Sequence, residues 1–259
     1  MAVELHHRIN GPWDAPVVML SNSLGTNLEM WAPQVPALST RFRVLRYDQR
    51  GHGASAVPPG PYDIPDLGRD ALDLLDRLEL ERVHLCGLSI GGMTGMWLAA
   101  NAPERIARLV LLCTTAYFGK PEIWRERTAD VRAGGTEAVA DAGVERWFTP
   151  AFRERKPELT ARYRAMIAAT PDEGYIECCG ALERLDERGD LPRIRAETLV
   201  IAAAEDPVAP PDPHGWLLSE RIPSARLEVL TNAAHLANVE QAEAVTGLIL
   251  DHLDTGGAA

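Results

Sequence analysis

Residues Val83–Gly92, VHLCGLSIGG, contain the motif that decides the fold. Val83 to Cys86 read as the end of a buried β-strand, and the residues after Gly92, MTGMWLAANAPERI, follow a helical pattern. Between them, Gly87 to Gly91 form a G-x-S-x-G sequence centred on Ser89. Between a strand and a helix, this sequence forms a nucleophile elbow, which exposes the serine hydroxyl at a helix N-terminus. Elsewhere it is an ordinary tight turn rich in glycine.

The length and composition limit the class of protein. A chain of 259 residues with 46% hydrophobic residues is long enough for one large α/β core with a modest insertion. The net charge of −11 argues against nucleic acid or an anionic membrane as a partner, because an acidic surface attracts neither. The four cysteines favour reduced core thiols over a disulfide framework. No apolar run approaches the roughly 20 residues that cross a bilayer, so we expect a cytoplasmic protein with no membrane partner.

Apolar strand-like runs alternate with helical patterns along most of the chain. This alternation predicts an α/β fold, with a mostly parallel sheet covered by helices on both faces. The expected strands are residues 3–9, 17–20, 43–47, 83–86, 108–113, 198–202 and 226–230. Helical patterns outside the elbow cover residues 31–38, 66–80, 213–221 and 241–253.

The character of the chain changes between Ala116 and Gly189. Strand-like runs stop there, and four helical segments follow one another at 121–133, 136–148, 157–169 and 171–185. We therefore expect residues 116–189 to form a helical cap inserted into a core made of residues 1–115 and 190–259. Such insertions commonly occupy loops at the edge of a sheet that carries the active site.

A serine nucleophile needs a base to take its proton, and the base needs an acid to orient it. His235 lies in a turn after the last expected strand, and Asp206 directly follows the strand LVIAA. The order serine, aspartate, histidine is the one that elbow-type architectures use. Glu205 remains an alternative to Asp206, and a surface turn is the alternative role for His235. His52 lies in a turn punctuated by glycines, where a structural polar role suffices.

Catalysis by a serine also needs two backbone N–H groups that face the carbonyl oxygen as it becomes negative. Ile90 directly follows the serine and can supply one of them. The loop Ser21–Gly25 follows an apolar strand and can supply the other, which we expect to be Leu24. Backbone donors leave the identity of the side chains fairly free.

The segments SNSLG, DQRGHG, GLSIGG, the EDP turn and NAAH resemble the α/β-hydrolase superfamily over nearly the whole chain. A narrower resemblance, to 3-oxoadipate enol-lactonases, rests on SNSLGTNLEMW, GLSIGGMTGMWLA, ERWFTPAFR, ATPDEGYIECCGAL and HLANVEQ. It implies hydrolysis of the enol lactone to 3-oxoadipate, in the protocatechuate branch of aromatic catabolism, with neither a cofactor nor a metal. By this resemblance Ser89, Asp206 and His235 carry over as the catalytic triad, and Leu24 and Ile90 as the oxyanion donors.

The implied small-molecule substrate carries a carboxylate, so a cationic side chain of the cap is expected to face it. Arg127 and Arg132 are the candidates, with Arg125 behind them, and Trp124 and Trp147 are candidates for the pocket wall. The alternative is that these arginines are solvated and the tryptophans are core residues.

Three other functions remain open. A broad carboxylesterase or a cofactor-free perhydrolase would use the same triad. A dehalogenase or an epoxide hydrolase would need a carboxylate nucleophile, which Ser89 argues against. A ligand-binding protein without turnover could keep the fold.

Overall fold

The computed structural model describes residues 3–254, and its strands form a seven-stranded sheet in the order β1-β3-β2-β4-β5-β6-β7. Strand β1 runs antiparallel to β3, and the other neighbouring strands are parallel. The central strands are buried on both faces, as expected for a parallel sheet covered by helices. The strands are β1 (His7–Asn10), β2 (Val17–Ser21), β3 (Arg43–Tyr47), β4 (Val83–Leu88), β5 (Ile106–Leu112), β6 (Glu197–Ala203) and β7 (Ala225–Leu230).

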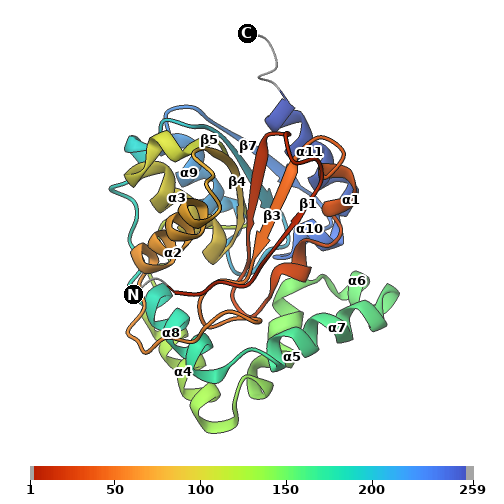
Figure 1. The fold of residues 1–259 in the computed structure, drawn as a ribbon. Coiled ribbons are helices and arrows are strands. Elements are labelled where there is room, and N and C mark those ends of the chain that lie inside the picture. Colours follow the sequence, from red (N-terminus) through yellow and green to blue (C-terminus); the bar gives the residue numbers. More distant parts are fainter. Residues whose placement is uncertain (1–2, 255–259) are drawn as a thin grey trace.

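Helices cover both faces of this sheet (Figure 1). One face carries α2 (Ile64–Arg77), α3 (Ile90–Asn101) and α9 (Trp216–Arg221), and the other carries α1 (Val35–Leu38), α10 (Ala237–Glu240) and α11 (Ala242–Asp254). The sequence of α2 shows why such a helix forms and packs against the sheet. Asp63 and Asp66 form a capping box at its start, and its apolar residues at helical spacing are buried.

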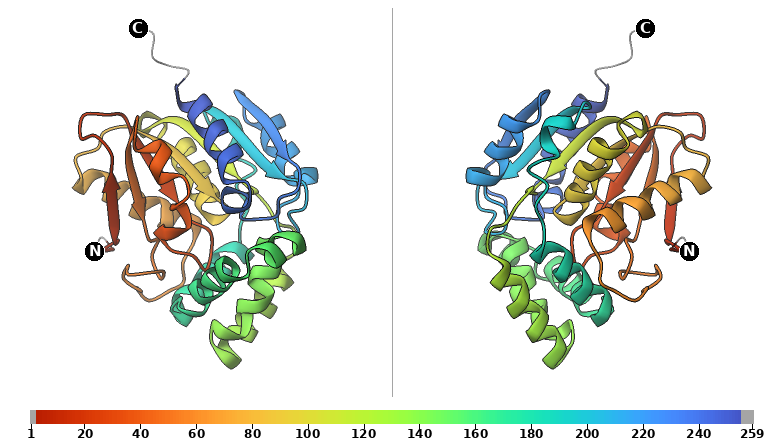
Figure 2. Two further views of the ribbon diagram at one scale, coloured as in Figure 1. Left: turned by 90° about the vertical axis from the view of Figure 1, so that its right-hand side faces the viewer. Right: turned by 90° about the vertical axis from the view of Figure 1, so that its left-hand side faces the viewer.

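Five helices between β5 and β6 lie together beside the sheet, at the lower end of the molecule in both views of Figure 2. We refer to these helices as the cap. They are α4 (Pro121–Gly134), α5 (Glu137–Trp147), α6 (Pro150–Arg155), α7 (Pro157–Ala168) and α8 (Asp172–Glu183). Three of them begin with proline, whose fixed φ suits the first helical position. The N–H of Leu236, in the core, donates to the carbonyl oxygen of Trp147 at 3.0 Å.

The structure corrects several element boundaries. The first strand is His7–Asn10, shorter than the expected 3–9 and shifted along the chain. The expected helix 31–38 is divided into a 3-10 turn, Leu28–Trp31, and the short α1, because Pro33 and Pro36 lack the N–H that a continuous helix needs. Helix α6 was missed, and the expected helix 213–221 divides into a turn, Pro211–Gly215, and α9. Among residues 3–254, no helix is both long and apolar enough to span a membrane.

Candidate active site

The serine of the central motif lies in a strained turn between β4 and α3. Ser89 has φ 57° and ψ −121°, a conformation that a residue other than glycine keeps only where its surroundings enforce it. Its carbonyl oxygen accepts hydrogen bonds from the Gly92 N–H at 2.8 Å and from Thr114 Oγ1 at 2.7 Å. Its N–H donates to the carbonyl oxygen of Leu112 at 3.1 Å. These bonds fix the backbone, so the Ser89 side chain stands at the N-terminus of α3.

Glycines on both sides of Ser89 allow the close packing that this turn requires. A Cβ on Gly87 would lie 2.2 Å from the carbonyl oxygen of Gly91. A Cβ on Gly91 would lie 2.3 Å from the carbonyl oxygen of Ser21, on the neighbouring strand β2. Both distances are far below van der Waals contact, so any other residue would move the strand or the helix.

His235, in the turn after β7, contacts Asp206, in the turn after β6. The distance from Nδ1 of His235 to Oδ2 of Asp206 is 2.8 Å, and the two side chains are 3% and 0% exposed. The other carboxylate oxygen accepts the N–H of Val208 at 2.8 Å. A carboxylate only accepts, so Nδ1 carries the proton, and a neutral His235 keeps a lone pair on Nε2. Glu205 is exposed, and its N–H donates to the Ala233 carbonyl oxygen.

Ser89 and His235 line the same cavity. The core contributes residues that follow β2, β4, β6 and β7, namely Ser23, Leu24, Ser89, Val208 and His235. In open α/β sheets the carboxyl ends of the strands are where ligands bind. The cavity volume is about 20 Å³, on a scale where one water molecule needs roughly 10–15 Å³. In this arrangement of the cap, the cavity therefore has room for about one water molecule.

The cap supplies the rest of the lining. It includes the three cap residues selected from the sequence, which are Trp124, Arg127 and Trp147. The other two arginines of α4 lie elsewhere. Arg125 forms an ion pair with Glu183 at 2.6 Å, and Arg132 lines a different cavity, between α4 and α8.

Four further cap residues line the cavity and were not expected from the sequence, namely Gly143, Arg146, Ile167 and Tyr175, and two of them carry polar groups. Arg146 lies on α5 and Tyr175 on α8. Burial lowers the pKa of Arg146 to about 10, and the positive charge of Arg127 acts in the same direction. The Arg127 guanidinium is 4.6 Å from the centre of the Trp124 ring. Within residues 3–254, neither arginine forms an ion pair with a carboxylate, so the cavity is lined by two guanidinium groups that have no carboxylate within ion-pair distance.

The two expected oxyanion donors also lie beside this cavity. Leu24 lines it, and Ile90 directly follows Ser89 at the start of α3. Both side chains are buried. The loop that carries Leu24 is held by a hydrogen bond from Asn22 Nδ2 to the carbonyl oxygen of Tyr47 at 2.7 Å.

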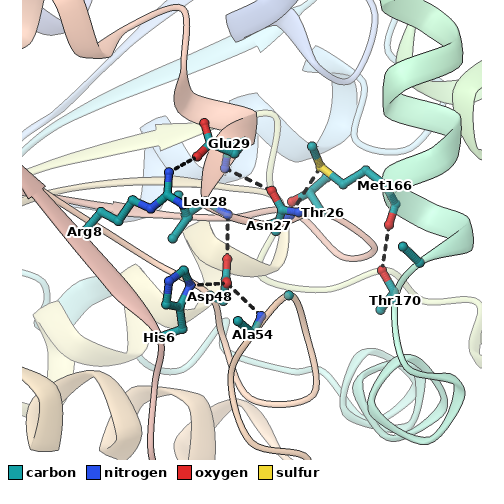
Figure 3. A pocket seen from close by; sticks show the side chains of 12 residues that line it. His6, Arg8, Thr26, Asn27, Leu28, Glu29, Asp48, Ala54, Met166 and Thr170 are labelled. Atoms are coloured by element: carbon teal, nitrogen blue, oxygen red, sulfur yellow. Dashed lines mark hydrogen bonds and ion pairs between the residues drawn. The ribbon is translucent and has the colours of Figure 1, made fainter.

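A larger cavity of about 300 Å³ is lined in part by residues 26–29, in the loop after β2 and the turn that follows it (Figure 3). Its ionisable side chains are paired with one another. Nδ1 of His6 is 2.8 Å from Asp48, and Arg8 is 2.6 Å from Glu29. Neither Ser89 nor His235 lines it, so the chemistry of the motif lies in the smaller cavity. In the described part of the chain, no group of three or more His, Cys, Asp or Glu side chains could hold a metal ion.

Comparison with known proteins places the chain in a family. The model of the alpha/beta hydrolase fold matches residues 16–242. A 3-oxoadipate enol-lactonase of Acinetobacter baylyi is 43% identical over 93% of this chain and 90% of its own length. The crystal structure of the enol-lactonase from Burkholderia xenovorans has a TM-score of 0.94 and 46% identity, over 97% of this chain and 96% of that one.

A thermophilic esterase from Thermogutta terrifontis, with malate bound, has a TM-score of 0.90 and 30% identity, over 98% of this chain and 94% of that one. These relatives support a hydrolase of lactones or esters. The chain belongs to the α/β-hydrolase family and is similar, within it, to the 3-oxoadipate enol-lactonases.

Proposed function

We propose that this protein opens 3-oxoadipate enol-lactone to 3-oxoadipate through an acyl-serine intermediate, as a step of aromatic catabolism. One observation supports this proposal above the others. A single cavity is lined by Ser89, by His235 in contact with Asp206, and by two arginines that have no carboxylate partner among residues 3–254. A nucleophile and an anion-binding site therefore adjoin, as a lactone that bears a carboxylate requires. The relatives named as enol-lactonases support the same substrate.

The first half of the reaction forms the acyl-serine. Ser89 Oγ attacks the lactone carbonyl carbon while Nε2 of His235 takes the hydroxyl proton, and Asp206 stabilises the resulting imidazolium. The ring C–O bond then breaks, and the leaving enolate takes the proton from His235 and tautomerises to a ketone. An enolate is a better leaving group than an alkoxide, so little acid assistance is needed. The N–H groups of Leu24 and Ile90 bind the oxyanion, and each such donor lowers the barrier by about 3–4 kcal/mol.

The second half releases the product. A water molecule gives a proton to His235 Nε2 and attacks the acyl carbonyl carbon. The bond to Ser89 Oγ breaks, and the proton returns from His235 to the serine. The product then carries two carboxylates, one newly formed beside Ser89 and one that Arg127 and Arg146 have held throughout.

Replacing the nucleophile tests the chemistry. We expect Ser89→Ala to lower kcat by at least about a thousandfold, because the change removes the hydroxyl that forms the acyl intermediate. Loss of the ultraviolet absorbance of the enol lactone measures turnover, and thermal unfolding checks that the fold is kept. Near-normal turnover would contradict the mechanism. Labelling of the wild-type serine by a fluorophosphonate probe, absent in the variant, would exclude a ligand-binding protein that lacks an active nucleophile.

Replacing a cap arginine tests the substrate class. We expect Arg146→Gln to lower kcat/KM for the enol lactone by about 10–100-fold, the effect of losing one charge-assisted hydrogen bond. Hydrolysis of the neutral ester p-nitrophenyl acetate should change little. Arg132→Gln, on the cap but away from the cavity, is the control. Equal losses on both substrates, or a wild-type preference for the neutral ester, would favour a broad carboxylesterase.

A further inference from the structure

A buried histidine outside the reacting groups contacts the loop that carries Leu24. His52 follows β3 in the turn 48–53, and it is fully buried. Its Nε2 lies 3.0 Å from the backbone nitrogen of Gly25, and its Nδ1 lies 3.2 Å from the carbonyl oxygen of Arg50. A backbone N–H only donates and a carbonyl only accepts. The two contacts therefore require one tautomer, with the proton on Nδ1 and a lone pair on Nε2.

The surroundings of His52 keep the imidazole neutral. Burial lowers its pKa to about 4, although the carbonyl of Arg50 and the negative charge of Asp48 act in the opposite direction. The amide of Gln49 is 3.5 Å from Nε2 and carries no charge. Throughout the neutral range, Nε2 therefore remains an acceptor for the Gly25 N–H.

The bond acts on the residue next to Leu24. Gly25 has φ +75°, and the N–H of Thr26 donates to the carbonyl oxygen of Ser23 at 3.2 Å, which closes a tight turn around Leu24. The N–H of Gly25 belongs to the planar peptide unit that follows Leu24. Holding this unit restricts the rotation of Leu24, and with it the direction of the Leu24 N–H.

The far end of the same loop is held by the turn that carries His52. Oδ1 of Asp48 accepts the N–H of Leu28 at 2.6 Å, and Oδ2 contacts Nδ1 of His6 at 2.8 Å and the N–H of Ala54 at 3.0 Å (Figure 3). The turn therefore contacts the loop at two points, and His52 provides the one next to Leu24.

We propose that His52 is a positioning residue for the oxyanion hole, because its Nε2 lone pair holds the Gly25 N–H and so directs the Leu24 N–H toward the cavity. The inference rests on the proposed function, in which the Leu24 N–H binds the oxyanion. A histidine that only filled space would affect stability, whereas a positioning residue affects the barrier. Misplacing a reacting group by about 1 Å can cost a hundredfold in rate.

Two variants with different hydrogen-bonding capacity separate these roles. His52→Leu removes the acceptor, and we expect kcat to fall by about 10–100-fold with KM nearly unchanged, less than the 10²–10³-fold loss of a donor itself. His52→Gln keeps an acceptor oxygen, and we expect it to recover most of kcat. His84→Leu and His84→Gln replace another mostly buried histidine in β4, outside the cavity lining, and serve as controls. Equal kcat for His52→Leu and His52→Gln, or a loss confined to thermal stability, would overturn the proposal.

The tautomer of His52 gives a readout that does not depend on activity. In the ¹⁵N spectrum of wild-type protein labelled at histidine, we expect the signal pair that disappears in His52→Gln to show a protonated Nδ1 and an unprotonated Nε2 from pH 5.5 to 9. A protonated Nε2, or titration in that range, would overturn the proposal.

If the wild-type protein failed to hydrolyse the lactone but hydrolysed p-nitrophenyl acetate, the substrate proposal would fail. The kcat values of the His52 variants could then still be compared on the ester.

Discussion

Two adjacent carboxylates, Glu205 and Asp206, differ sharply in their surroundings. Asp206 is buried and accepts hydrogen bonds from His235 and from the N–H of Val208. Glu205 is exposed. A buried carboxylate whose two oxygens both accept hydrogen bonds is held in one orientation, and it can in turn fix the ring of His235. The exposed glutamate has no comparable constraint. The geometry thus favours Asp206 as the acid where the residue pattern alone left both open.

Replacing Asp206 tests this choice. We expect Asp206→Asn to lower kcat by about 10³–10⁴-fold, because an amide can donate to Nδ1 of His235 and so favours the wrong tautomer. Glu205→Gln is the matched control and should retain nearly all activity. Initial rates on the enol lactone measure both variants. A larger loss for Glu205→Gln than for Asp206→Asn would reverse the choice of acid.

Part of the candidate site is accessible from sequence because chain order and local pattern determine it. Ser89 follows from its motif, and His235 from its place after the last strand. Arg146 and Tyr175 were missed because they reach the cavity only through the packing of α5 and α8, which no local pattern encodes. The bond from Gly25 to His52 joins residues that are distant in sequence, so the turn around His52 indicated only a structural polar role.

At the scale of elements, the contact between α8 and the turn 48–53 joins the cap to the core. A Cβ on Gly174, in the first turn of α8, would lie 2.1 Å from the carbonyl oxygen of Gly51. A Cβ on Gly51, where φ is +73°, would lie 2.5 Å from the Cα of Gly174. The two backbones therefore approach as closely as glycine permits. Tyr175, the next residue of α8, lines the cavity, so this contact also determines where its ring lies.

Adding a methyl group at this contact tests its importance. We expect Gly174→Ala to destabilise the protein by about 1–3 kcal/mol, because neither backbone can yield without moving α8. It should also lower kcat/KM through the displacement of Tyr175.

The matched control is Gly180→Ala in the same helix. Its Cβ would meet only the flexible end of Arg184, at 3.3 Å. This change should be neutral or stabilising, by up to about 1 kcal/mol of helix propensity. Urea unfolding and steady-state kinetics measure both variants. Equal stability of the two would show that α8 adjusts freely against the turn.

The helices and strands expected from the sequence agree with the structure where one local pattern extends over a whole segment. The strand expected at 43–47 is found at Arg43–Tyr47, and the helix of the elbow follows Ser89 directly. They fail where prolines interrupt the pattern. Helix α6, between Pro150 and Pro157, is only six residues long, so it gives too little periodicity to be recognised.

At the scale of the whole molecule, buried titratable groups make stability depend on pH in opposite directions. Burial lowers the pKa of His52 to about 4, from 6.5. Unfolding therefore takes up a proton between these values, and stability falls as the solution is acidified from pH 6.5 to 4. Burial also lowers the pKa of His84, which changes stability in the same direction, and the partial exposure of this side chain makes the effect smaller. Glu187 acts in the opposite direction. Burial raises its pKa well above 4.5, and the charge of Asp190 adds to the increase.

Glu187 lies where the chain returns from the cap to the core. Its N–H donates to the carbonyl oxygen of Ala116 at 2.9 Å. Neither of its carboxyl oxygens has a hydrogen-bond partner among residues 3–254. Because the folded pKa is raised, the stability contribution of Glu187 is complete below pH 4.5 and is lost as the pH rises through the folded pKa. Over that interval the free energy of unfolding falls by about 1.4 kcal/mol per pH unit, because the folded protein holds the proton on Glu187 and unfolding releases it.

Glu187→Gln removes this titration and keeps the shape of the protonated side chain. We expect the variant to match the wild type closely at pH 5 and to be increasingly more stable at pH 6, 7 and 8. Glu205→Gln, at an exposed carboxylate, is the control for the chemical change itself. Urea unfolding at each of the four pH values measures the free energies. A constant difference between Glu187→Gln and the wild type would mean that the carboxyl at the junction of cap and core is ionised in the folded protein. The junction would then have to open to water, because a buried carboxylate without a partner is too costly to persist.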